Sequence, residues 1–224
     1  RLVDPAGNLA DEVDFKTGGA WPELAKGGGS SLERLHPRMD GRRASAWRDS
    51  DESGKSVFQT YAWTNTYLEL NPVGEPSDYR ELHFHLVRDG HVVLRNIALL
   101  KDGTNFILHG TRLSTNGLSD HGWLCQGTHW ASFMTNGELH IVADGHGDNR
   151  GNRVEIDVPG IRPGQTYSLQ FEARWISGTP RLIAESWDHT IGHSFLLEIP
   201  DNLGTPGRVN SRFVSAPAPQ VDAL

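Results

Sequence analysis

Apolar residues at every second position mark the clearest predicted strand of the chain. Tyr167, Leu169, Phe171, Ala173 and Trp175 alternate strictly with more polar residues. Because successive side chains of a strand point to opposite faces, these five residues share one face. The segment therefore predicts a half-buried strand with Trp175 in the core.

The same alternation recurs at short intervals through residues 56–200. Leu82, Phe84 and Leu86 share one face of a predicted strand, and Asp89 with Gly90 forms a hairpin signal after it. Other strands are predicted at 57–61, 91–100, 138–143, 154–158, 181–187 and 194–199. Many short strands between turn signals predict an all-β fold, an antiparallel jelly-roll β-sandwich.

The two ends of the chain carry weaker patterns. Residues 3–15 predict a strand, a tight turn and a strand, and a short strand follows at 32–35. Residues 38–55 are polar without a period, which predicts a loop or linker. The expected organisation is a small β segment with a linker at 1–55, the sandwich at 56–200, and a linker or tail at 201–224.

Composition narrows the function classes. The chain has 224 residues, of which 37% are hydrophobic and 22% charged, so it can bury a core. Its formal net charge of −7 argues against nucleic acid as a partner, because phosphate contacts favour basic proteins. Apolar stretches are only a few residues long, so no membrane insertion is expected. A single cysteine excludes an internal disulfide.

Two parts of the chain resemble known families. Residues 4–8 and 28–33 resemble the C-terminal part of a lamin-tail domain. Residues 148–155 and 167–175 resemble a galactose-binding-like jelly roll, as found in carbohydrate-binding modules. Tandem segments of these kinds are similar to parts of large exported multidomain proteins of planctomycete-like bacteria. The resemblance implies an extracellular or cell-surface location and neighbouring domains of the same polyprotein as partners.

The order of the segments within the resemblance is unusual. Residues 90–100 look like the last strand of such a jelly roll, yet they precede the segment from Asn105 that looks like the first. One circularly permuted sandwich is the simplest interpretation, because neither half alone would bury a face.

Aromatic and polar residues suggest a saccharide site. An indole can stack on the apolar face of a pyranose while neighbouring polar groups bind its hydroxyls. In the resembled family one sheet face is often the concave binding surface. The predicted ligand-binding residues are Trp187, Asp188, His189, Trp130, Glu172 and Arg174. Core packing of the indoles and an ordinary ion-paired strand face are the alternatives.

A loop rich in oxygen ligands predicts a structural Ca²⁺ site. Ca²⁺ takes several carboxylate and carbonyl oxygens from a flexible loop, and jelly rolls of the resembled family often carry one. The predicted ligands are Asp144, Asp148, Asn149 and Asn152. The loop lacks the EF-hand pattern, and a simple Gly/Asn/Asp turn is the alternative.

Two histidines provide a second, different metal signal. His83 and His85 lie two residues apart on one strand, so both rings point to the same face and can reach one ion. No third ligand is evident nearby, and the favoured interpretation is the exposed polar face of a half-buried strand. The hydrolase elbow, phosphate-binding loop and zinc-protease motifs are absent from the sequence.

Three functions are therefore compatible with the sequence. The first is a non-catalytic carbohydrate-binding or adhesion module whose partner is a polysaccharide or cell-surface glycan. The second is a structural subunit of a surface layer, filament or coat. The third is a metal-dependent enzyme that uses surface histidines. The lack of catalytic motifs favours a protein that is not an enzyme, without deciding the point.

Overall fold

The computed structural model describes residues 1–22, 25–26, 30–51, 53–70, 80–115, 122–144 and 151–200. The tail predicted at 201–224 lies outside the described residues. Among the described residues the chain divides into two compact units: unit 1 is Arg1–Lys55 with residues 199–200, and unit 2 is Ser56–Glu198. No helix among the described residues is long and apolar enough to span a membrane.

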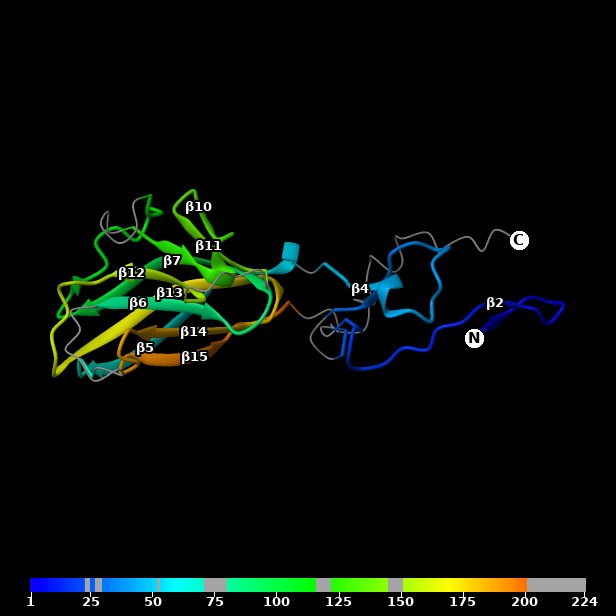
Figure 1. Cartoon of the computed structure of the whole chain (residues 1–224), viewed down its shortest axis with the longest axis horizontal. Coiled ribbons are helices and arrows are strands. Elements are labelled where there is room, and N and C mark those ends of the chain that lie inside the picture. Colours follow the sequence, from blue (N-terminus) through cyan, green and yellow to red (C-terminus); the bar gives the residue numbers. More distant parts are fainter. Residues whose placement is uncertain are drawn as a thin grey trace. The chain divides into compact units, whose positions relative to one another are not determined.

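Unit 2 contains two antiparallel sheets (Figure 1). The five-stranded sheet has the order β15 (Gly192–Leu196), β14 (Arg181–Ser186), β6 (Glu81–Leu86), β12 (Arg153–Asp157) and β9 (Leu124–Gln126). The six-stranded sheet has the order β10 (Phe133–Thr135), β11 (Glu138–Ala143), β7 (Gly90–Lys101), β13 (Gln165–Gly178) and β5 (Gln59–Tyr67), with β8 (Thr104–Asn105) paired to β7. A 3-10 turn, η3 (Gly127–His129), follows β9. The prediction of an all-β antiparallel sandwich is confirmed.

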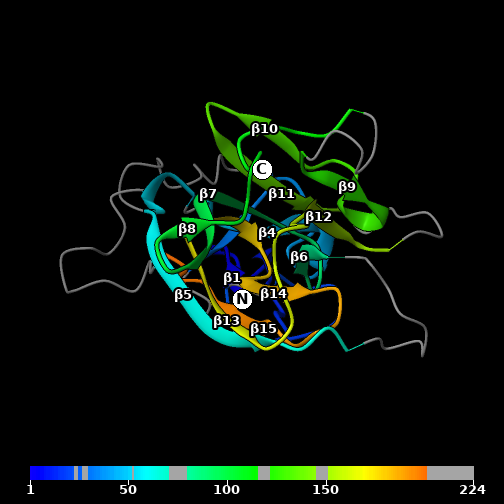
Figure 2. The ribbon, with the colours of Figure 1, turned by 90° about the vertical axis from the view of Figure 1, so that its left-hand side faces the viewer.

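The core lies between these two sheets, and Figure 2 shows them as two layers when viewed along the strands. Phe84 of β6 and Phe171 of β13 meet edge to face with ring centroids 5.5 Å apart. Trp123 packs on Phe84 at 5.6 Å, and Trp175 is also fully buried. The alternating residues on the inner faces thus supply the buried apolar area that stabilises unit 2.

One strand of unit 2 is longer than its sequence pattern predicts. The pattern indicates a strand at 57–61, whereas β5 runs over Gln59–Tyr67 and pairs with β13 along its whole length. The outward positions of β5 hold Thr60, Ala62 and Thr64, which are small or β-branched. Thr60 and Thr64 favour a strand whereas Ala62 does not, and the three together produce no strong apolar alternation, so the pattern misses this part of β5.

Unit 1 consists of two small antiparallel pairs. β1 (Leu2–Val3) pairs with β2 (Leu9–Asp11), and β3 (Leu32–Arg34) pairs with β4 (Trp47–Asp49). Two 3-10 turns, η1 (Ala44–Ala46) and η2 (Ser53–Lys55), flank β4. The prediction that 38–55 is only a loop or linker is therefore wrong, because β4 lies within it.

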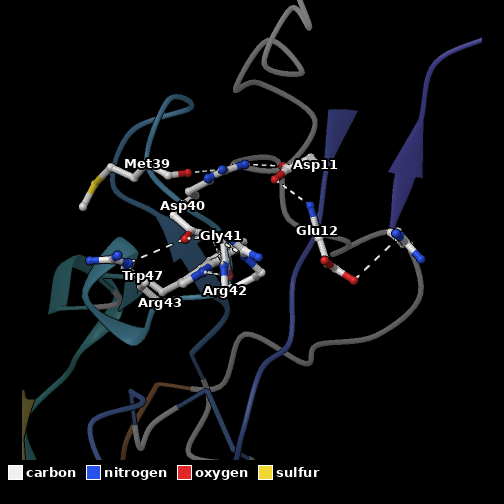
Figure 3. A network of polar contacts seen from close by, with 10 residues as sticks. Asp11, Glu12, Met39, Asp40, Gly41, Arg42, Arg43 and Trp47 are labelled. Atoms are coloured by element: carbon white, nitrogen blue, oxygen red, sulfur yellow. Dashed lines mark hydrogen bonds and ion pairs between the residues drawn. The ribbon is translucent and has the colours of Figure 1, made fainter. Parts of the chain in front are cut away.

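Polar contacts stabilise this part of unit 1 (Figure 3). The guanidinium of Arg34 binds the carboxylate of Asp11 and the backbone oxygen of Met39. The indole Nε1 of Trp47 donates to the backbone oxygen of Gly41 at 2.9 Å. A segment ordered by such contacts shows no hydrophobic period, which explains why the sequence pattern missed β4.

Candidate functional site

Ionisable side chains gather on the face of the five-stranded sheet that is turned away from the core. Strand β6 alternates, so its apolar residues enter the core and its Glu and His residues point outward. The register places Glu155 of β12 on one side of His83 and Glu185 of β14 on the other. The outer-face cluster is defined as Glu81, His83, His85, Glu155 and Glu185.

Three of the five residues of this cluster are buried although they lie on an outer face. Glu81, His83 and Glu155 are each 3% exposed or less. His83 Nε2 lies 2.9 Å from a carboxylate oxygen of Glu81 and 3.7 Å from one of Glu155. Arg153 and Gln126 both bind the carboxylate of Glu155. The interpretation of His83 as part of an exposed polar face is therefore wrong: flanking strands and their side chains cover it.

Burial determines the protonation states of Glu81, His83 and Glu155. It lowers the pKa of His83 to about 3, with the nearby Arg153 adding to the effect, so the imidazole is neutral. Burial also raises the pKa of Glu81 and of Glu155, and the proximity of the two carboxylates raises that of Glu155 further. The neutral ring can therefore donate its Nε2 proton to Glu81.

The other two residues of the cluster, His85 and Glu185, are more accessible. His85 Nε2 lies 3.2 Å from Glu185 Oε1, and His189 Nδ1 lies 2.8 Å from Glu185 Oε2. His85 Nδ1 lies 3.0 Å from the backbone oxygen of Asn152. Burial alone would raise the pKa of Glu185, but the contacts with His85 and His189 outweigh it and lower that pKa to about 2. Glu185 is therefore a carboxylate at neutral pH.

Two triads in the cluster place metal-ligating atoms close together. His83, His85 and Glu185 form one, and Glu81, His83 and Glu155 form the other. Within each triad the three ligand atoms lie within 4.8 Å of one another. Glu185, from the neighbouring strand, could thus supply the third ligand atom that the sequence did not reveal for His83 and His85.

Trp187 packs against the cluster just beyond the end of β14. Its ring meets the His83 ring edge to face at 5.9 Å, and the guanidinium carbon of Arg153 lies 5.5 Å from its centre. Its backbone N–H donates to the backbone oxygen of Glu81 at 3.1 Å. The indole is half-buried on the sheet surface and is not part of the core between the sheets.

The other predicted saccharide residues are scattered. Asp188 is buried in the turn after β14, where it accepts hydrogen bonds from Ser186, Thr190 and the Leu70 amide. Trp130, in contrast, is 62% exposed beside η3. Trp187 and His189 therefore lie next to the outer-face cluster, while Asp188 has its oxygens directed into the turn.

Glu172 and Arg174 lie on the other sheet. They alternate along β13 with core residues such as Phe171, so they point away from the core on the opposite side of the sandwich. Glu172 binds Arg95 and Asn96, and the guanidinium carbon of Arg174 lies 5.2 Å from the ring centre of Phe58. The structure does not bring this pair together with Trp187.

The predicted Ca²⁺ loop is only partly described. Asp148 and Asn149 lie outside the described residues. Asn152 accepts the Thr128 N–H through Oδ1 at 3.0 Å, and its backbone oxygen contacts His85. The amide of Asp144 bonds the backbone oxygen of Thr128. The Ca²⁺ site remains a prediction.

Sequence reasoning missed Glu81, Arg153 and Glu155 as parts of the site. All three occupy outward positions of alternating strands, and that signal was present in the sequence. The missing information was which strands are neighbours, because β12 follows β6 by more than sixty positions in the chain. Only the sheet order brings these side chains together.

Comparison of the chain with protein-family models, with curated proteins and with solved structures gives no match.

Proposed function

We propose that unit 2 is a non-catalytic carbohydrate-binding module that takes a saccharide on the outer face of the five-stranded sheet. The observation that carries this proposal is the position of Trp187, a half-buried indole on a sheet surface beside a polar cluster. The resemblance to carbohydrate-binding modules of exported proteins supports the same function, with a cell-surface glycan as the partner.

The chemistry around Trp187 suits a sugar. A pyranose offers an apolar face that stacks on an indole and a rim of hydroxyls that donate and accept hydrogen bonds. Arg153 supplies donors, and the Glu185 carboxylate with His189 supplies an acceptor next to a ring nitrogen. Because ion pairs already hold these groups in place, binding a sugar would order few additional side chains.

Isothermal titration calorimetry against a panel of neutral and acidic polysaccharides tests the proposal, with tag-free protein kept in a chelator. We expect saturable binding to at least one glycan. Trp187→Ala should weaken that binding at least about tenfold, because truncating a central aromatic residue costs about 1.4 kcal/mol or more. Binding that is unchanged by Trp187→Ala, or no binding to any glycan, would contradict the proposal.

Two further variants sharpen this experiment. Leu108→Ala removes an exposed apolar side chain, 66% exposed, outside the cluster, and should leave the affinity unchanged. Trp130→Ala removes the exposed indole beside η3. If Trp130→Ala abolishes binding and Trp187→Ala does not, the glycan binds elsewhere and the assigned face is wrong.

A further inference from the structure

His85 is held in the tautomer that binds metals. Its Nδ1 lies 3.0 Å from the backbone oxygen of Asn152, which can only accept a hydrogen bond. Nδ1 therefore carries the proton, and the lone pair of the neutral ring lies on Nε2. A backbone carbonyl that fixes the second ring nitrogen in this way is the usual support of a metal-ligating histidine.

The Nε2 lone pair faces another acceptor. His85 Nε2 is buried and makes no hydrogen bond among the described residues, although Glu185 Oε1 is only 3.2 Å away. In the neutral ring this contact sets a lone pair against a carboxylate oxygen, and either a proton on Nε2, which forms an ion pair with Glu185, or a metal ion bound to both atoms relieves the repulsion. The 3.2 Å separation is also close to the spacing of two neighbouring ligands of one ion.

The remaining parts of a metal site are also present. A ring nitrogen of His83 lies within 4.8 Å of the ligand atoms of His85 and Glu185. The second oxygen of Glu185 is oriented by His189 Nδ1 at 2.8 Å. Two imidazoles and one carboxylate leave a fourth position for water or a ligand in a tetrahedral site.

The second triad, Glu81, His83 and Glu155, suits a metal less well. The guanidinium of Arg153 already binds the carboxylate of Glu155, and a positive charge at that point repels a divalent cation. Gln126 binds the other oxygen of the same carboxylate. The metal is therefore assigned to the triad at the more accessible edge of the cluster.

We propose that His83, His85 and Glu185 bind one first-row transition-metal ion, with Zn²⁺ as the best fit, on the outer face of the five-stranded sheet. Imidazole nitrogens favour Zn²⁺ and its neighbours over Ca²⁺ and Mg²⁺, which prefer oxygen ligands alone. This site is separate from the Ca²⁺ loop predicted at 144–152. The proposal also goes beyond glycan binding and does not depend on it.

The test uses tag-free full-length protein that has been stripped with a chelator and dialysed. We expect Zn²⁺ to bind at one ion per chain and to raise the melting temperature, because a ligand of the folded state stabilises it. Co²⁺ bound at the same site should develop visible absorption bands of a tetrahedral complex. Ca²⁺ and Mg²⁺ at the same concentrations should neither compete nor shift the melting temperature.

Variants locate the ion. His85→Gln and Glu185→Gln should each lower Zn²⁺ affinity at least about tenfold, and His189→Gln, which changes only the orienting contact, should lower it less. His36→Gln replaces an exposed histidine of unit 1 and should bind Zn²⁺ like the parent chain. Circular dichroism of each metal-free variant checks that it folds.

Two results would overturn the proposal. One is the absence of saturable Zn²⁺ binding to the folded parent chain. The other is unchanged affinity in both His85→Gln and Glu185→Gln. In a chain that folds without metal, imidazole nitrogen resonances report the ligands directly: those of His83 and His85 should shift on Zn²⁺ addition. Because glycan binding is measured in chelator, failure of either proposal leaves the other intact.

Discussion

The backbone amide of Leu86 donates a 2.9 Å hydrogen bond to Nε2 of His129, a side chain with no exposed surface. An amide can only donate, so Nε2 must be unprotonated and the ring neutral. Burial lowers the pKa of His129 to about 4 from its ordinary 6.5. This hydrogen bond links η3 to the end of β6. Because a proton on Nε2 would break the bond, the link is sensitive to acid.

Stability of unit 2 should fall as the pH drops from about 6.5 to about 4. In that window the unfolded chain binds a proton at His129 that the folded chain does not, so acid favours unfolding. A shift of this size corresponds to about 3 kcal/mol, all of it retained above pH 6.5. Urea denaturation at a series of pH values measures the effect.

A variant separates the share of His129 from that of other histidines. His83 and His91 also have a lowered pKa, mainly from burial, and act in the same direction. His129→Gln keeps a side chain that can accept the Leu86 amide bond but cannot titrate. The unfolding free energy of His129→Gln should therefore depend less on pH than that of the parent chain, while His36→Gln should behave like the parent. Equal pH dependence in His129→Gln and the parent would refute the role assigned to His129.

Two glycines with nearly the same backbone conformation should respond differently to alanine. Gly178 and Gly164 have φ of +71° and +72°. A Cβ at Gly164 meets nothing within 4 Å, so Gly164→Ala should cost only about 1 kcal/mol of backbone strain. A Cβ at Gly178 would overlap the backbone oxygen of Asp89, so Gly178→Ala should cost about 2–4 kcal/mol.

Chemical denaturation of both glycine variants provides the comparison. The turn that contains Gly178 joins β13 to β14, and Thr179 N–H bonds the backbone oxygen of Asp89 at 3.0 Å. The clash therefore acts on a connection between the two sheets. Similar losses of unfolding free energy in the two variants would show that the positive φ alone determines the requirement for glycine, without a contribution from the close approach of the Asp89 backbone.

Much of the fold could be predicted from the sequence, because alternation is a local property. Trp175 and Phe84 were assigned to the core from residues two positions away, and both are fully buried. The outer-face cluster could not be predicted in this way. His83 meets Glu155 and Glu185 only because β6 lies between β12 and β14. The alternation of side chains along a strand shows which residues share a face, but it does not show which strands are neighbours in the sheet.

Asp188 should prove to be a structural residue of the turn after β14. Its carboxylate accepts the Thr190 amide at 3.1 Å and the Leu70 amide at 3.0 Å, and it binds Ser186 as well. Asp188→Ala would leave these donors without their partner, at a cost of about 2–4 kcal/mol in unfolding free energy. Denaturation measures the loss.

The same variant distinguishes structure from ligand recognition. At a temperature where Asp188→Ala is still folded, its glycan affinity should match the parent chain, because its oxygens point into the turn. A large loss of affinity with unchanged stability would instead place Asp188 in the binding surface, as the sequence predicted.

An indole hydrogen bond should contribute to the local stability of unit 1 around the β3–β4 pair. Trp47 Nε1 donates to the backbone oxygen of Gly41 at 2.9 Å, and Trp47→Phe removes that donor while keeping an aromatic ring. We expect a loss of about 1 kcal/mol in local stability. Amide hydrogen exchange reports it at Leu35 and Ser50, whose N–H groups bond across the β3–β4 pair at 2.8 Å each.

Trp63→Phe is the matched control: Trp63 Nε1 has no hydrogen-bond partner among the described residues and lies in unit 2, so exchange at the two amides should not change. Faster exchange only in Trp47→Phe would establish that this bond holds the turn against β4, whereas equal exchange in the two variants would show that ring packing alone suffices.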